Sequence, residues 1–160
     1  MIGQLIEFYH QGLDHYFYSA DAREITGLDA GTGAKGWART GNAFTVLLAP
    51  GCPPGAHEQN AYRFYGRPSV GPDTHVFTVD REECRIVDQK GLWLYENAPF
   101  WATPPNSHGA CAWAGEIPLY RIWRPFGVSN HRFTTDSAIV DEMKAKGWID
   151  EGVAMCVRGR

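Results

Sequence analysis

Several features that would assign a function directly are missing from this 160-residue sequence. No apolar run approaches the roughly 18 residues of a membrane-spanning helix. The formal net charge is −3, with 15 Lys and Arg against 18 Asp and Glu. The basic residues form no stripe that could neutralise the phosphates of a nucleic acid. We therefore expect neither a nucleic-acid partner nor a membrane partner.

Motifs of known catalytic centres are missing as well. The sequence contains no Gly-x-Ser-x-Gly turn, no His-Glu-x-x-His motif and no glycine-rich phosphate loop. A glycosidase needs two carboxylates facing one bond, whereas Glu7, Glu96 and the Asp150-Glu151 pair lie far apart in the chain. We therefore expect no catalytic residues, no cofactor and no metal, and we expect that the protein is not an enzyme.

One pattern, by contrast, occurs three times. An aromatic strand begins at Ile6, Tyr62 and Tyr120. A strand with the pattern His-x-Phe follows and begins at His15, His75 and His131; in the first copy it reads His15-Tyr16-Phe17. A unit of this length cannot bury its apolar face alone, so the copies must pack around a shared core. We predict a single domain over residues 1–160 with pseudo-threefold repeats of ~55 residues, at about 5–49, 61–103 and 118–158.

Each copy has the same predicted elements. A short aromatic strand (5–10, 61–66 or 118–124) is followed by the histidine strand and then by a helix that begins at Asp21, Asp80 or Asp136. The first copy carries one extra residue between His15 and Asp21, and its helix can end at Gly31. Trp37, Trp93 and Trp148 open the last strands and are expected in the core. The fold class is therefore mainly β with three short helices (α+β).

Cysteine is scarce, and the four cysteines form no Cys-x-x-Cys pair, which argues against a zinc site. Cys52 and Cys111 occupy matching places, each about ten residues before a copy begins. We therefore favour the disulfides Cys52–Cys84 and Cys111–Cys156. The alternative is four reduced, buried thiols.

The third copy carries the most distinctive motifs. They are Leu119-Tyr-Arg-Ile-Trp123, Asn130-His-Arg-Phe-Thr-Thr-Asp136 and Gly147-Trp-Ile-Asp-Glu-Gly152. With its two companion copies, this pattern resembles the DUF5648 family over nearly the whole chain. The resemblance implies a β-trefoil-like arrangement with a helix inserted in each lobe. It also implies an extracellular accessory role in glycan or cell-wall attachment. The chain departs from the family pattern at Glu96-Asn97, where Glu-Gly is usual, and at Thr40, where the Glu is missing.

Matching residues of the copies are the candidate ligand contacts. The histidines could each bind a sugar hydroxyl, although we favour a structural role because all three copies keep them. Their varied neighbours Asp14, Thr74 and Asn130 are expected on the opposite strand face, in contact with solvent or ligand. Sugar faces could stack on the aromatic rings that end the first strands, although core packing explains these rings equally well. The candidates are Tyr9, Asp14, His15, Tyr65, Thr74, His75, Glu96, Trp123, Asn130, His131 and Glu151.

These observations favour a non-catalytic, lectin-like module that binds a glycan or cell-wall polysaccharide through as many as three shallow sites. The alternatives are a structural or protein–protein interaction domain and an enzyme of an unrecognised type. The first copy begins within five residues of Met1, which leaves no room for a secretion signal there. We expect either a cytoplasmic protein or, in preference, a monomeric extracellular or cell-surface domain of a longer secreted chain.

Overall fold

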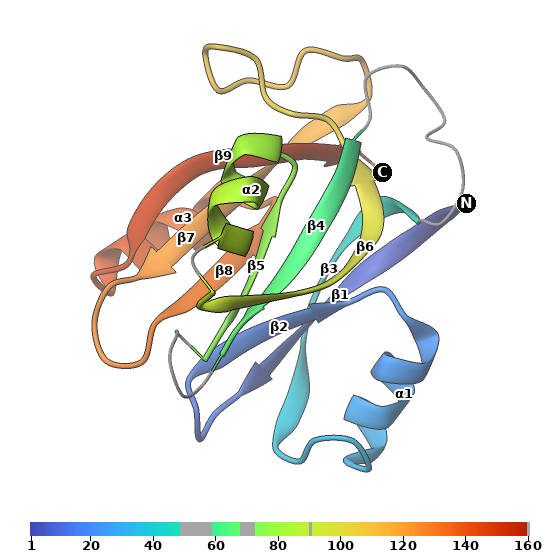
Figure 1. The fold of residues 1–160 in the computed structure, drawn as a ribbon, viewed down its shortest axis with the longest axis vertical. Coiled ribbons are helices and arrows are strands. Elements are labelled where there is room, and N and C mark those ends of the chain that lie inside the picture. Colours follow the sequence, from blue (N-terminus) through green and yellow to red (C-terminus); the bar gives the residue numbers. More distant parts are fainter. Residues whose placement is uncertain (49–58, 68–72, 90, 160) are drawn as a thin grey trace.

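The computed structural model describes residues 1–48, 59–67, 73–89 and 91–159. Within these ranges the chain is mainly β-structure with three short helices, as expected (Figure 1). The elements are β1 (Ile2–His10), β2 (His15–Ser19), α1 (Ala22–Ala30), β3 (Trp37–Leu48), β4 (Gln59–Gly66), β5 (His75–Thr78), α2 (Arg81–Gln89), β6 (Trp93–Ala102), β7 (Glu116–Arg124), β8 (Asn130–Thr134), α3 (Ser137–Ala145) and β9 (Ile149–Arg158). No helix in the described ranges is long and apolar enough to cross a membrane.

The order strand, strand, helix, strand occurs three times along these elements. We name the three sets the first unit (β1, β2, α1, β3), the second unit (β4, β5, α2, β6) and the third unit (β7, β8, α3, β9). In each unit the first strand lies between the other two and pairs antiparallel with both. Pairing of β3 with β6 joins two units in the sheet β2-β1-β3-β6-β4-β5. The third unit forms its own sheet, β8-β7-β9, which contacts the larger sheet through β2, β3, β5 and β6 (Figure 1).

Each helix begins after an aspartate whose carboxylate accepts hydrogen bonds from backbone N–H groups of the first turn. These aspartates are Asp21, Asp80 and Asp136, as the sequence predicts. The backbone N–H of each aspartate donates to a hydroxyl two residues earlier, on Ser19, Thr78 or Thr134. α1 ends at Gly31, which has a φ of 63° in the left-handed region that favours glycine.

Three aromatic rings, one from each histidine strand, meet at the centre of the core. Tyr18, Phe77 and Phe133 contact one another with ring centroids 5.5 to 6.4 Å apart. All three side chains are almost completely buried. The Tyr18 hydroxyl donates to the carbonyl of Phe133 and accepts from its N–H, so this polar group is satisfied inside the core. The described units therefore share one core.

The strand register corrects the matching of the histidines. Tyr16 pairs with Tyr9, just as His75 pairs with Tyr65 and His131 pairs with Trp123. The counterpart of His75 and His131 is therefore Tyr16, and His15 lies one residue earlier, in the place held by Thr74 and Asn130. The expectation that His15 belongs to one set with the other two histidines was wrong. The extra residue between His15 and Asp21 marks this shift.

Arginines that are buried or half-buried connect the units to one another. Arg63 of the second unit pairs with Glu24 of α1, with Nη1 3.0 Å from Oε2. Arg121 of the third unit pairs with Glu83 of α2 at 3.1 Å. Between the third and first units the charges are exchanged, because Arg132 on β8 pairs with Glu7 on β1 at 3.1 Å. Each of the three contacts between units thus contains a charged pair.

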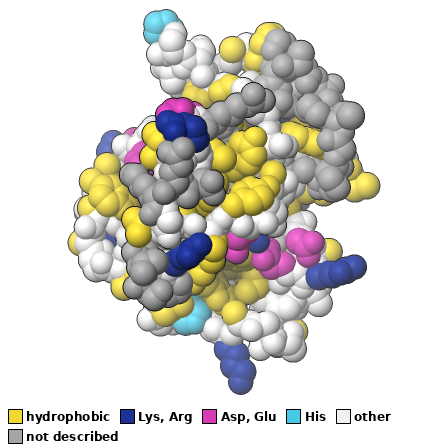
Figure 2. Space-filling view, viewed as in Figure 1, with side chains coloured by type: hydrophobic (Ala, Val, Ile, Leu, Met, Phe, Trp, Pro, Cys, Tyr) yellow, Lys and Arg dark blue, Asp and Glu magenta, His cyan; other side chains and the backbone are white. Residues whose placement is uncertain are grey.

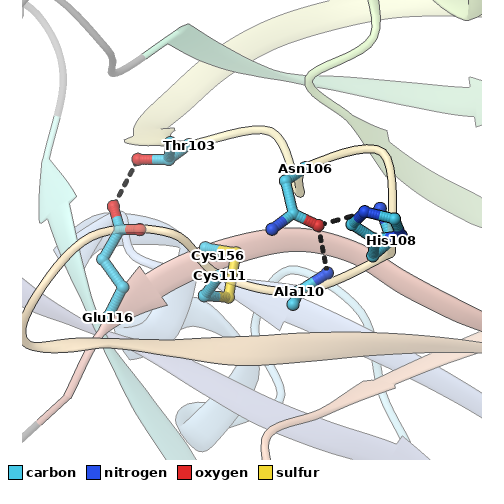
Figure 3. Close-up of a disulfide and its surroundings, with 7 residues drawn as sticks. All are labelled: Thr103, Asn106, His108, Ala110, Cys111, Glu116 and Cys156. Carbon is cyan, nitrogen blue, oxygen red and sulfur yellow. Dashed lines mark hydrogen bonds between the residues drawn. A yellow bond between two sulfur atoms is a disulfide. The ribbon is translucent and has the colours of Figure 1, made fainter.

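A disulfide joins Cys111 to Cys156 of β9, which confirms one of the two expected pairs. It fastens the loop between β6 and β7, in which the side chain of Asn106 accepts hydrogen bonds from the backbone N–H groups of His108 and Ala110 (Figure 3). Cys84 is half-buried against the core. Its expected partner, Cys52, lies outside the described residues, so the Cys52–Cys84 pair stays a prediction.

Candidate functional site

A pocket of about 430 Å³ opens between the first and second units. The first unit contributes α1, Phe17 of β2 and Trp37 of β3, and the second unit contributes Tyr65, His75 and Glu96. Three of the predicted ligand contacts, Tyr65, His75 and Glu96, are therefore brought together. On the face drawn in Figure 2, acidic side chains gather in a hollow near the middle, with hydrophobic side chains beneath them. The volume lies in the range typical of small-molecule sites.

A chain of touching rings forms the apolar side of the pocket. Trp37 contacts Phe17 with centroids 5.7 Å apart, Phe17 meets His75 edge to face at 4.8 Å, and His75 stacks on Tyr65 at 4.6 Å. The Tyr65 hydroxyl donates to Asp73 at 2.6 Å, which fixes the ring in its plane. Burial and this hydrogen bond raise the pKa of Tyr65 to about 12. The pocket therefore offers a rigid aromatic surface.

The polar side of the pocket is built around Arg63, which lies over the Phe17 ring at 5.3 Å. Its guanidinium group binds both oxygens of Glu24, at 3.0 and 3.2 Å. Its Nε lies 2.7 Å from Oε2 of Glu96, and the same oxygen is 3.3 Å from Nε2 of His75. Burial acts to raise the pKa of Glu96, but His75 and Arg63 outweigh it and the pKa is lowered. Glu96 is therefore held as a carboxylate at the edge of the pocket.

A glycine distinguishes the α1 side of this pocket from the other two helices. Gly27 lines it, six residues after the aspartate that begins α1. The same place is filled by Ile86 in α2 and by Glu142 in α3. At the contact between the third and first units, moreover, the buried Trp148 touches Tyr16, with centroids 6.1 Å apart. A Cβ atom on Gly27 would meet no atom closer than 4.0 Å, so the missing side chain leaves open space on the α1 side of the pocket.

Comparison with known proteins adds a family but no activity. A family model described as a domain of unknown function (DUF5648) matches residues 4–158. The chain belongs to this family. The comparisons with curated proteins and with solved structures give no match. The resemblance read from the three motifs is confirmed, and the site must be interpreted from its own geometry.

Three of the predicted contacts are buried away from this pocket. His15, Thr74 and Asn130 lie together where the histidine strands of the three units begin. The Asn130 amide donates to the Thr74 hydroxyl at 2.9 Å and accepts from the N–H of Tyr16 at 3.0 Å. Burial lowers the pKa of His15. The expectation that Thr74 and Asn130 face solvent was wrong, because both side chains hold the units together.

Asp14 is exposed and is bonded both within its own hairpin and to the third unit. Its carboxylate accepts from the Tyr9 hydroxyl at 2.8 Å and pairs with Arg124. The half-buried Trp123 is similarly fixed by a hydrogen bond from its ring nitrogen to Ser129. Neither Tyr9 nor Trp123 lines the pocket.

His131 and Glu151 are the third-unit counterparts of His75 and Glu96. Burial and the neighbouring Arg121 lower the pKa of His131 to about 3. Glu151 accepts a hydrogen bond from Nε of Arg121 at 2.9 Å. It borders a separate pocket of about 500 Å³ that Pro104 also lines. The predicted third-unit contacts therefore do not reproduce the aromatic pocket of the first and second units.

Sequence reasoning missed several residues of the pocket. Glu24 and Arg63 meet only through the packing of one unit on the next, which no pattern within a copy reveals. Trp37 was expected in the core, like Trp148, but it is half-buried and forms a wall of the pocket. One usable signal was present, since Gly27 stands where the other two helices carry Ile86 and Glu142.

Proposed function

We propose that this protein is a non-catalytic carbohydrate-binding module that acts as a monomer at a cell surface, within a longer secreted chain. The observation that carries the proposal is the pocket walled by the linked rings of Trp37 and Tyr65 and edged by the carboxylate of Glu96. The apolar face of a sugar packs well on rigid rings. Carboxylates accept hydrogen bonds from the hydroxyl groups at the edge of such a sugar.

The fold proposed with this function is a closed, trefoil-like ring of three repeats. Three features support it: the thrice-repeated element order, the three touching rings of the core and the charged pair at each contact between units. The ring places the pocket between two units, so that a bound sugar contacts both. The same arrangement yields one principal aromatic site, since the pocket between the second and third units has no aromatic residue among the described residues that line it.

The test begins with a glycan array and continues with titration of the best glycan by calorimetry. Gly27→Ile should fill the pocket and weaken binding by at least about tenfold, which corresponds to about 1.4 kcal/mol. Gly27→Ala is the matched control. A methyl group there meets no atom closer than 4.0 Å, and alanine favours the helix by up to about 1 kcal/mol. This variant should bind within about twofold of the native protein.

Trp37→Ala supplies a second variant that removes one wall of the pocket. We expect loss of measurable binding, while Trp113→Ala, in the loop between β6 and β7, should bind normally. Thermal unfolding of both variants separates a lost contact from a lost fold. If no glycan binds, or if Gly27→Ile binds as well as the native protein, the proposal is wrong. In the first case a protein-interaction role becomes the better hypothesis.

A further inference from the structure

The charges around the aromatic pocket are not balanced. Glu24, Glu96 and Arg23 line the pocket. Asp73 is bonded to Tyr65, and Asp21 accepts from the backbone N–H groups of Arg23 and Glu24. The buried Arg63 is the other charged side chain in contact with this group. Two carboxylates thus line the pocket and two more are bonded to residues that line it, against two guanidinium groups, of which the exposed Arg23 is the more screened.

Glu96 is the carboxylate with capacity for a ligand. Both oxygens of Glu24 are already bound by Arg63. In Glu96 the closest contacts to Arg63 and to His75 are both made by Oε2. Glu151 repeats this arrangement with Arg121 and His131, whereas Thr40 donates to Glu7. Glu96 differs from Glu151 in its place, because Glu96 lines the pocket that carries the aromatic wall and Glu151 lines a different pocket.

A neutral ligand would leave this excess negative charge uncompensated as it displaces water from the pocket. A cationic group would compensate the charge at Glu96 and would also be attracted by the faces of the adjoining Trp37 and Tyr65 rings. Resting on the proposed carbohydrate function, we infer that the sugar carries a protonated amino group. The ammonium group donates to Glu96, and the apolar face of the same ring packs on the aromatic wall. The ligand class is thus an amino sugar whose amine is not acetylated.

The experiment compares three tetrasaccharides that share one linkage: glucosamine, N-acetylglucosamine and glucose. Calorimetry at low and at high salt gives the affinity of the native protein for each. We expect the glucosamine tetramer to bind at least about tenfold more tightly than the other two at low salt. High salt should shrink this preference because it screens the interaction between the charges.

Two matched variants assign the preference to one carboxylate. Glu96→Gln should remove the preference for glucosamine and leave the affinity for the neutral tetramers within about threefold. Glu151→Gln changes the corresponding residue of the third unit, outside the pocket, and should leave all three affinities unchanged. Circular dichroism and thermal unfolding establish that both variants are folded. If Glu96→Gln does not fold, Glu96→Asp replaces it, because this variant keeps the charge but draws the carboxylate back from the pocket and should reduce the preference for glucosamine.

The outcomes separate this inference from the proposed function. If the three tetramers bind equally and Gly27→Ile abolishes all binding, the site binds sugars but the inference is wrong. The inference is also wrong if the glucosamine preference survives in both Gly27→Ile and Glu96→Gln, since attraction to the net negative protein would explain it. If no tetramer binds and the array shows no other glycan, the proposed function itself fails.

Discussion

Replacement of Glu7 tests the idea that buried charge holds the third unit against the first. The Glu7 side chain is 1% exposed and accepts from five donors. Two are the Nε and Nη2 atoms of Arg132, each at 3.1 Å. The others are the hydroxyls of Tyr18 and Thr40, both at 2.7 Å, and the amide of Asn42 at 2.9 Å. Glu7→Gln keeps the shape of the side chain but places an amide among these donors.

The expected loss of stability is large. Removing one partner of a buried ion pair costs about 3–5 kcal/mol because the remaining charge stays buried. The Arg132 side chain is only 9% exposed, so water cannot readily replace the carboxylate. The Tyr18 hydroxyl loses less, since its single proton, shared with the carbonyl of Phe133, can then be donated to that carbonyl alone. For a domain of this size the free-energy loss corresponds to a fall in Tm of about 6–20 °C.

Urea unfolding followed by circular dichroism measures this loss directly. The double variant Glu7→Leu with Arg132→Met should recover to within about 2 kcal/mol of the native protein, because well-packed apolar residues replace a buried pair at little cost. Lys146→Ala breaks the exposed pair with Glu142 and should leave the unfolding midpoint nearly unchanged. A loss below about 1 kcal/mol for Glu7→Gln would refute the reasoning.

Three further measurements test other parts of the structure. His131 is neutral in the folded state, with a pKa of about 3, while the unfolded chain takes up its proton near 6.5. Its contribution to the free energy of unfolding should therefore fall by up to about 1.4 kcal/mol per pH unit below pH 6.5. In the His131→Gln variant the urea midpoint should depend less on pH, when measured between about pH 6.5 and 5, than it does in the native protein. Replacing Cys111 and Cys156 by serine opens a loop with a sequence separation of 45 and should cost about 4 kcal/mol, measured as a lower Tm under oxidising conditions. Tyr65→Phe removes the bond to Asp73 but keeps the ring, so calorimetry should show glycan affinity retained within about threefold and unfolding should show a loss of about 1 kcal/mol.

Features that depend on neighbouring residues were predictable from the sequence. The helix starts follow from aspartates that cap the first turn, and Gly31 ends α1 because glycine adopts the left-handed conformation at no steric cost. The Cys111–Cys156 pair followed from the spacing of cysteines relative to the copies. The closed trefoil-like ring remains a proposal, since it depends on contacts between distant parts of the chain.

The register of the histidine strands was harder to predict, because the position held by His75 can also be held by a tyrosine. Tyr16 lies against Tyr9 with centroids 4.9 Å apart, much as His75 lies against Tyr65 at 4.6 Å. A tyrosine can thus take the place of a histidine without changing the hairpin. The reliable register signal is the hydroxyl residue two positions before each helix-capping aspartate, such as Ser19, since its hydrogen bond to the aspartate N–H fixes that distance.

The contacts between units show why alignment of the three copies identifies the residues that form the fold more readily than the residues that form a binding site. Arg63 and Arg121 occupy equivalent positions, and each pairs with the helix of the preceding unit. In the first unit the equivalent residue is Glu7, and its partner, Arg132, lies on a strand. A pattern carried from one copy to the next would search for that partner on α3 and miss it. The same reasoning applies to Gly27, because its missing side chain affects only the space between α1 and the second unit. Among similar units, the residues that break the pattern therefore mark where one contact between units acquires a property that the others lack.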